Sequence, residues 1–109
     1  MNLAVIGAGY VGLTTAICLA SQNHKMTIFD IDNEKIKQIQ NRKLPFFENG
    51  LQEILEDVIS SNNLVAVNNL NQLVEKTDGC FICVGTPTKD NSIDLTQIIN
   101  ATESLANSI

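Results

Sequence analysis

The chain has 109 residues, the size of one domain; 44% of them are apolar and 17% are charged. This balance supplies a hydrophobic core and excludes an intrinsically disordered chain. Seven basic against twelve acidic side chains give a formal net charge of −5, which argues against nucleic acid or an anionic membrane as a partner. Three cysteines are too few for a disulfide scaffold, and the cytoplasm is the expected compartment.

No side chain from Met1 to Asn23 is charged, a length that could suggest a membrane span or signal peptide. However, no basic segment precedes this stretch, three glycines interrupt it, and a strand-like segment follows Lys25. We therefore expect neither membrane insertion nor export.

The first part of the chain predicts strands and helices in alternation. The apolar run Leu3–Ile6 is typical of a strand buried on both faces, and Val11–Ser21 predicts a helix packed against it. Met26–Phe29 predicts a second strand. Asp32 is placed to cap a following helix, which Leu44-Pro45 should end. Ile36 and Ile39 should face inward on that helix. Phe46 and Phe47 are expected to pack beneath the next loop, with contact to a partner domain as the alternative.

The second part continues the alternation. Apolar residues at helical spacing predict one buried face of a helix, at Leu51, Ile54, Leu55, Val58 and Ile59. Next come a third strand at Leu64–Val67, a short helix at Leu70–Val74, a fourth strand at Cys80–Val84 and a last helix at Leu95–Ile109. This alternation predicts an α/β, Rossmann-like, doubly wound parallel sheet with strand order 3-2-1-4. Because such folds usually have six strands, residues 1–109 are interpreted as the incomplete first domain of a longer protein.

The segment from Gly7 to Gly12 matches G-x-G-x-x-G between a predicted strand and a predicted helix, the context that the dinucleotide motif requires. Gly7 would allow the tight turn, Gly9 would admit a pyrophosphate, and Gly12 would let the helix approach the strand. Asp30 ends the second strand, eighteen residues after Gly12. Its carboxylate could accept hydrogen bonds from the ribose hydroxyls and would repel a 2′-phosphate, which favours NAD over NADP. The alternative is an acid that merely ends a strand.

The turn Val84-Gly85-Thr86-Pro87-Thr88 follows the fourth strand, which should lie beside the first across the cofactor crevice. Its threonine hydroxyls could bind ribose or phosphate, and Gly85 would allow close approach. An ordinary solvated turn is the alternative interpretation.

These segments together resemble the UDP-glucose/GDP-mannose dehydrogenases over essentially the whole chain. The segments are Gly7-Ala8-Gly9-Tyr10-Val11-Gly12-Leu13, Phe29-Asp30-Ile31-Asp32, Glu48-Asn49-Gly50-Leu51 and Val84-Gly85-Thr86-Pro87-Thr88. The resemblance implies oxidation of UDP-glucose to UDP-glucuronate with two NAD, in nucleotide-sugar metabolism that feeds polysaccharide biosynthesis. It also implies a homodimer or higher homo-oligomer when full length. One departure is Asn49, where the family usually has proline.

The resemblance implies that Val11, Asp30, Lys35 and Thr86 contact the cofactor. Together with the glycine motif and the turn after the fourth strand, the expected cofactor-binding residues are Gly7, Gly9, Tyr10, Val11, Gly12, Asp30, Lys35, Val84, Gly85, Thr86 and Pro87. From the residues alone, Lys35 could reach the adenosine ribose or a phosphate, but a lysine at such a position is more often a solvated helix residue. The family's catalytic cysteine, its assisting residues and its sugar-nucleotide domain would lie beyond residue 109. No catalytic residue is therefore assigned.

Cys80 and Cys83 form a C-x-x-C pair, a spacing known from redox and metal sites. Because they lie in an apolar strand with odd spacing, they should point to opposite faces. We expect these two and Cys18 to be core residues without a metal, since zinc-site spacing is absent. His24 is expected in a surface turn.

Two other functions remain open from the sequence. A member of the same family could instead oxidise GDP-mannose or a UDP-N-acetylhexosamine. A different class, a nucleotide-sensing regulatory module, also combines the glycine motif with a strand-end acid. The Val84–Thr88 turn and the Leu51 helix argue against the sensing module, and Glu48-Asn49-Gly50-Leu51 favours UDP-glucose.

Overall fold

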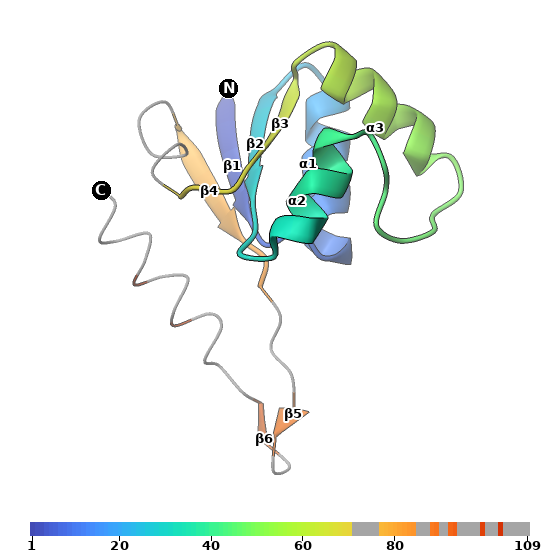
Figure 1. The fold of residues 1–109 in the computed structure, drawn as a ribbon. Helices are drawn as coiled ribbons and strands as arrows, with labels where there is room; N and C mark the ends of the chain where they lie inside the picture. The colour runs from blue at the N-terminus through green and yellow to red at the C-terminus, as the bar shows by residue number, and fades with distance from the viewer. Residues whose placement is uncertain (71–76, 85–87, 90–91, 94–98, 100–102, 104–109) are drawn as a thin grey trace.

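The computed structural model describes residues 1–70, 77–84, 88–89, 92–93, 99 and 103 (Figure 1). The strands are β1 (Asn2–Ile6), β2 (Lys25–Phe29), β3 (Leu64–Val67), β4 (Gly79–Ile82), β5 (Thr88–Lys89) and β6 (Ser92–Ile93). The helices are α1 (Tyr10–Ser21), α2 (Asn33–Gln40) and α3 (Leu51–Ser60).

The first four strands form one parallel sheet in the order β3-β2-β1-β4, which confirms the predicted topology. β1 is central, and its Val5 pairs with Ile28 of β2 on one side and Phe81 of β4 on the other. β5 and β6 form a separate antiparallel pair that the sequence did not predict. The order reverses at β1, where the chain leaves for β2 on one side and β4 lies on the other.

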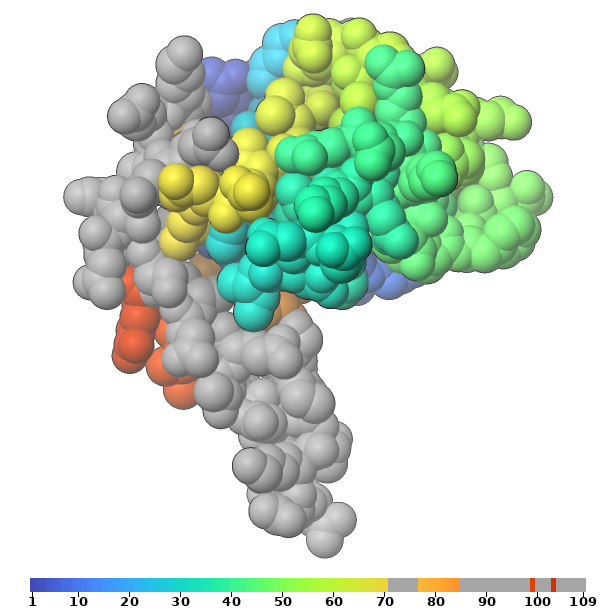
Figure 2. Space-filling view, viewed as in Figure 1, coloured from blue at the N-terminus to red at the C-terminus, as the bar shows by residue number. Residues whose placement is uncertain are grey.

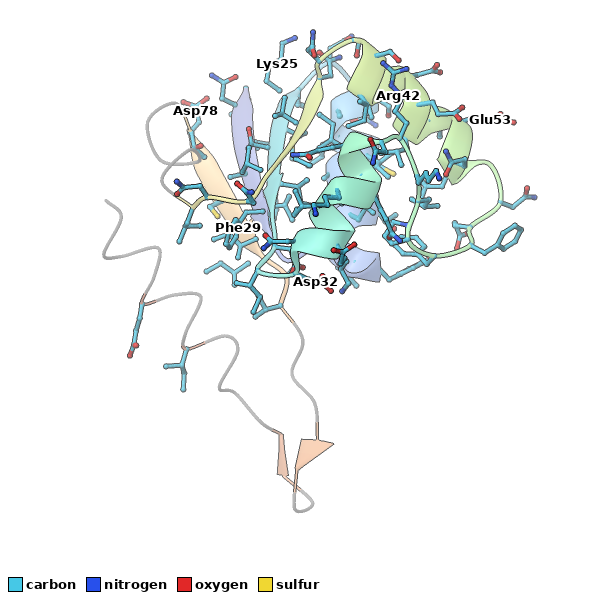
Figure 3. The ribbon with its side chains drawn as sticks, viewed as in Figure 1. Lys25, Phe29, Asp32, Arg42, Glu53 and Asp78 are labelled. Atoms are coloured by element: carbon cyan, nitrogen blue, oxygen red, sulfur yellow. The ribbon has the colours of Figure 1, made fainter. Side chains whose placement is uncertain are left out.

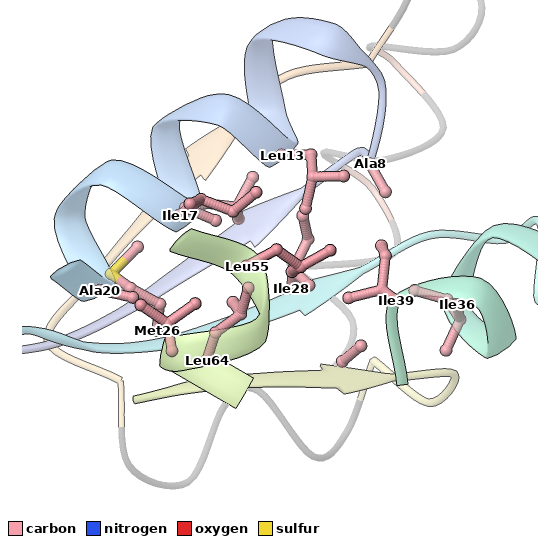
Figure 4. Close-up of a cluster of buried hydrophobic side chains, with 14 of the residues drawn as sticks. Ala8, Leu13, Ile17, Ala20, Met26, Ile28, Ile36, Ile39, Leu55 and Leu64 are labelled. Atoms are coloured by element: carbon pink, nitrogen blue, oxygen red, sulfur yellow. The ribbon is translucent and has the colours of Figure 1, made fainter. Parts of the chain in front are cut away.

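The hydrophobic core lies mainly between one face of the sheet and all three helices (Figure 4). Its largest fully buried side chains come from the strands and helices alike: Val5, Leu13, Ile17, Met26, Ile28, Ile36, Ile39, Leu55 and Leu64. Figure 2 shows α2 and α3 covering this side of the molecule. On the other face, Ala4 and Ile6 are buried beside Phe29 and Val67. β1 is therefore buried on both faces, as its apolar run predicted.

Two residues beyond the end of each described helix lies a residue with positive φ that is not glycine: Asn23, Arg42 and Asn62. At α2, the Arg42 N–H donates to the Ile39 carbonyl at 2.9 Å and the Lys43 N–H to the Gln38 carbonyl at 2.8 Å. This paired closure is the Schellman motif. It ends α2 at Gln40, so the predicted helix end at Leu44-Pro45 was wrong.

Burial follows the predicted pattern with specific exceptions. Ile36 and Ile39 are buried as expected, whereas Ile54 is exposed on α3. The predicted helices at 70–74 and 95–109 fall almost entirely outside the described residues. Leu70 is described and packs against the smaller core cluster, formed by Ala4 and Ile6 on the second face of the sheet.

Two of the three cysteines contradict the expected core packing. Cys18 and Cys80 are exposed, and Cys83 is half-buried against the main core. Cys80 pairs in register with Ala4, whose side chain lies in the other cluster, so the two cysteines of the pair do face opposite sides. Partial desolvation raises the pKa of both the Cys80 and Cys83 thiols, and the charge of Cys83 adds to the effect at Cys80, which disfavours the reactive thiolate.

The closest approach between helix and sheet occurs at Gly12 of α1. A Cβ at Gly12 would overlap the Gly7 carbonyl oxygen and lie 3.1 Å from the Cys83 Cβ. Gly7 itself has φ +108, and a Cβ there would lie 2.5 Å from the Cys83 carbonyl oxygen. Both glycines are therefore required by packing within the protein.

We expect Gly12→Ala to lower the free energy of unfolding by at least about 2 kcal/mol, because α1 must shift away from β1 to admit a methyl group. The midpoint of urea unfolding measures this loss. Gly9→Ala is the matched control, since a Cβ at Gly9 would meet no atom within 4 Å. Equal midpoints for the two variants would show that the backbone accommodates the methyl group and that the close approach does not constrain the fold.

Candidate functional site

The predicted cofactor elements meet at the carboxyl ends of β1, β2 and β4. The Gly7 N–H donates to the Phe29 carbonyl at 2.8 Å, and the Cys83 N–H donates to the Ile6 carbonyl at 2.7 Å. These bonds hold the start of the glycine loop (Gly7–Gly12) between the ends of β2 and β4. Figure 3 shows Asp32 near this end of the sheet and Lys25 and Asp78 near the opposite end. In open α/β sheets this edge, at the reversal of strand order, is where ligands bind.

The glycine loop presents the N-terminus of α1 at this edge. Gly9 is the N-cap and supplies no side-chain hydrogen bond, so the amides of the first turn have no acceptor within the helix. Those amides and the helix dipole favour an anion. Gly9 has an ordinary φ of −75, whereas Gly7 has a positive φ. A Cβ at Gly9 would also meet open space, whereas one at Gly7 or Gly12 would clash. The space beside Gly9 therefore suits the pyrophosphate of a dinucleotide.

Asp30 lies half-buried directly after β2 and contacts the glycine loop. Its Oδ2 accepts the Ala8 N–H at 2.8 Å, and its Oδ1 accepts the Asp32 N–H at 2.8 Å. The sequence predicted a carboxylate at this edge but gave no sign of its bond to Ala8, because the two residues are 22 positions apart.

The exposed Tyr10 side chain contacts two other residues of the protein. Its hydroxyl donates to Glu48 Oε2 at 3.0 Å, and its ring lies 5.1 Å from the Phe46 ring, centre to centre. The hydrogen bond and the negative charge of Glu48 raise the pKa of Tyr10. Only the Tyr10 backbone is left to face an anion at the helix N-terminus. Phe46 packs as expected, but Phe47 is 91% exposed, so the prediction that it packs was wrong.

The remaining predicted residues lie around the same edge. Val11 is 66% exposed on the first turn of α1, and Lys35 is half-buried in the first turn of α2. Asp32 caps α2 as predicted, accepting the Glu34 N–H at 3.0 Å and the Lys35 N–H at 3.4 Å. Val84 packs against the smaller core cluster, whereas Gly85, Thr86 and Pro87 lie outside the described residues.

Sequence reasoning did not single out Ile31, which is 87% exposed directly after Asp30. An apolar residue following a strand-end acid was the available signal. Among the described residues, no three His, Cys, Asp or Glu side chains gather closely enough to hold a metal ion. Within the same residues, no helix has the length and apolar character to cross a bilayer.

Comparison with solved structures shows close similarity in fold. The chain superposes on GDP-mannose dehydrogenase from Pseudomonas aeruginosa, solved as a ternary complex, with a TM-score of 0.97 and 33% identity. The superposition covers the whole of this chain and 25% of that one. A UDP-glucose dehydrogenase from Pyrobaculum islandicum gives a TM-score of 0.92 and 30% identity, over 98% of this chain and 25% of that one.

Sequence comparison finds relatives with the same two kinds of name. GDP-mannose 6-dehydrogenase from Pseudomonas syringae is 40% identical over 91 residues, which are 84% of this chain and 21% of the relative. UDP-glucose 6-dehydrogenase from Pseudomonas aeruginosa is 36% identical over 106 residues, which are 96% of this chain and 23% of the relative. The chain thus spans less than a quarter of the length of these two relatives.

A sequence profile described as the NAD binding domain of the UDP-glucose/GDP-mannose dehydrogenase family matches residues 1–109. The profile spans both the glycine loop and Asp30, whose arrangement fits a dinucleotide on physical grounds alone. The chain therefore belongs to the UDP-glucose/GDP-mannose dehydrogenase family, as its NAD-binding domain.

Proposed function

We propose that this domain serves a UDP-glucose 6-dehydrogenase, which oxidises the sugar C6 alcohol to a carboxylate while reducing two NAD. The observation that carries the proposal is the open helix N-terminus at Gly9 beside the Asp30 carboxylate, in a chain of this family. NAD, when bound, supplies the acceptor for the hydride that leaves the sugar. This chain's own residues bind and orient the cofactor.

The proposed binding residues have distinct tasks. The backbone amides of Tyr10, Val11 and Gly12 receive the pyrophosphate, since helix geometry leaves them without intrahelical acceptors. The Asp30 carboxylate accepts hydrogen bonds from the ribose hydroxyls and disfavours a 2′-phosphate by charge repulsion. Exposed Ile31 offers an apolar contact to the adenosine. The other proposed contacts are Gly7, Gly9, Lys35, Val84, Gly85, Thr86 and Pro87.

The choice of UDP-glucose rests on the extent of the sequence match. The UDP-glucose 6-dehydrogenase from Pseudomonas aeruginosa aligns with 96% of this chain, whereas the GDP-mannose 6-dehydrogenase from Pseudomonas syringae aligns with 84%. GDP-mannose is the second candidate, because the shorter alignment has the higher identity, 40% against 36%. We further propose a cytoplasmic enzyme that assembles as a homo-oligomer.

The substrate is tested with the full reading frame of the gene, by following the absorbance of reduced nicotinamide. We expect two reduced cofactors per UDP-glucose, and no turnover by the 109-residue chain, which has no assigned catalytic residue. Preferential turnover of GDP-mannose or UDP-N-acetylmannosamine would replace UDP-glucose by that sugar. NAD binding without turnover of any sugar would favour the nucleotide-sensing module instead.

Gly9→Ala tests whether the pyrophosphate occupies the open space at the glycine loop. We expect NAD affinity to fall roughly tenfold or more, because the added methyl group would stand where the phosphates approach the backbone. Isothermal titration of the 109-residue chain measures the affinity. The urea midpoint should stay unchanged, since a Cβ here meets nothing in the protein. Unchanged affinity would place the pyrophosphate elsewhere.

Asp30→Ala tests the preference for NAD over NADP. We expect NAD affinity to fall roughly tenfold to a hundredfold, the effect of losing hydrogen bonds to a charged group. NADP affinity should fall less, because its 2′-phosphate no longer faces a carboxylate. The ratio of the two affinities, measured by titration, is the decisive quantity. A ratio equal to that of the native chain would show that Asp30 does not receive the ribose.

A further inference from the structure

We infer that Asp30 has a second task in cofactor binding: it holds the glycine loop in position through the Ala8 amide. Its Oδ2 accepts the Ala8 N–H at 2.8 Å, while its Oδ1 accepts the Asp32 N–H at 2.8 Å. One carboxylate therefore links the loop before α1 to the turn before α2. Asp30 acts on the pyrophosphate site as a positioning residue, an inference that rests on the proposed binding of NAD.

The Ala8 amide depends on this carboxylate because of where Ala8 lies. Ala8 is fully buried, and a buried N–H without an acceptor is costly. The backbone hydrogen bonds between β1 and β2 extend as far as Gly7, the residue before Ala8. The Gly7 N–H donates to the Phe29 carbonyl at 2.8 Å. The Asp30 side chain supplies the acceptor for the next amide, that of Ala8. Removing the carboxylate would leave Ala8 without its described acceptor.

Between Gly7 and Tyr10, whose side chain bonds to Glu48, the described residues offer the loop few contacts besides the bond from Ala8 to Asp30. Gly9 has no side chain to cap α1, and the space around its missing Cβ is open. The amides that would meet the pyrophosphate begin one residue after Gly9. Their direction is therefore set on one side by the bond from Ala8 to Asp30, and on the other by the contact of Gly12 with the Gly7 carbonyl.

The two tasks of Asp30 are compatible. Each oxygen of an ionised carboxylate can accept about two hydrogen bonds, so both oxygens that hold backbone amides keep capacity for a ribose hydroxyl. Bound ribose would thus add to the described bonds without displacing them. The loop is ordered before NAD arrives, which reduces the cost of ordering it during binding.

The decisive experiment pairs Asp30→Ala with an NAD analogue whose adenosine ribose lacks both hydroxyls. If Asp30 served the ribose alone, the native chain and the variant would bind this analogue equally well. We expect the variant to bind it about fivefold more weakly, the factor for losing one hydrogen bond that positions the loop. Isothermal titration with both chains gives the four affinities needed, for NAD and for the analogue.

Hydrogen exchange of the Ala8 amide, measured without any cofactor, gives a readout that is independent of NAD binding. We expect exchange at least about tenfold faster in Asp30→Ala, while the amides of Val5 and Ile28 in the sheet keep their protection. Asp30→Glu keeps a carboxylate and is the second variant should Asp30→Ala unfold. It should restore part of the protection at Ala8.

Asp32→Ala is the matched control, because it removes the cap of α2 but leaves the Asp30 carboxylate and the Ala8 bond intact. It should change neither Ala8 exchange nor analogue affinity. The inference is overturned if Asp30→Ala leaves either the analogue affinity or the Ala8 exchange at its native value. If neither chain binds NAD, the proposed function fails, whereas faster Ala8 exchange would still demonstrate the bond that holds the loop.

Discussion

The contact of α1 with β1 at Gly12 is the constraint on which the rest of the structure depends. With no Cβ at Gly12, the first turn of α1 lies against the Gly7 carbonyl, at the carboxyl end of the central strand. This approach brings the N-terminus of α1 to the edge where β2 and β4 also end. The same helix then contributes Leu13 and Ile17 to the core shared with α2 and α3. The position of α1 that Gly12 allows thus determines both the packing of the core and the location of the helix N-terminus at the candidate site.

Much of this arrangement could be predicted because its signals are local in the sequence. The apolar runs of β1 and β2, the three glycines and the capping Asp32 each lie within a few residues of the structure they produce. The parallel sheet followed from the alternation, and the strand order followed from the order usual in doubly wound dinucleotide folds. The edge that joins the glycine loop to Asp30 follows from topology alone, and its place at the reversal of strand order was correctly predicted.

What failed depends on contacts between distant residues or on unusual backbone conformations. Arg42, two residues after the end of α2, has φ 62, and an arginine in the sequence does not predict this left-handed conformation. The contact of Tyr10 with Glu48, 38 residues away, was not predicted either, because a motif of six residues carries no signal for it. Cys80 lies on β4, at the edge of the four-stranded sheet, where an apolar sequence does not ensure burial.

The three glycines of one motif answer to different physical demands. Gly7 and Gly12 are fixed by atoms of the protein, through backbone conformation at one and close packing at the other. A Cβ at Gly9 would meet no atom of the described residues within 4 Å, so the close packing that explains Gly7 and Gly12 does not explain the glycine there. Asp30 stands between these cases, since it holds the Ala8 amide and also faces the proposed ribose site. A motif match therefore mixes evidence for a fold with evidence for a cofactor, and only positions such as Gly9 distinguish the two.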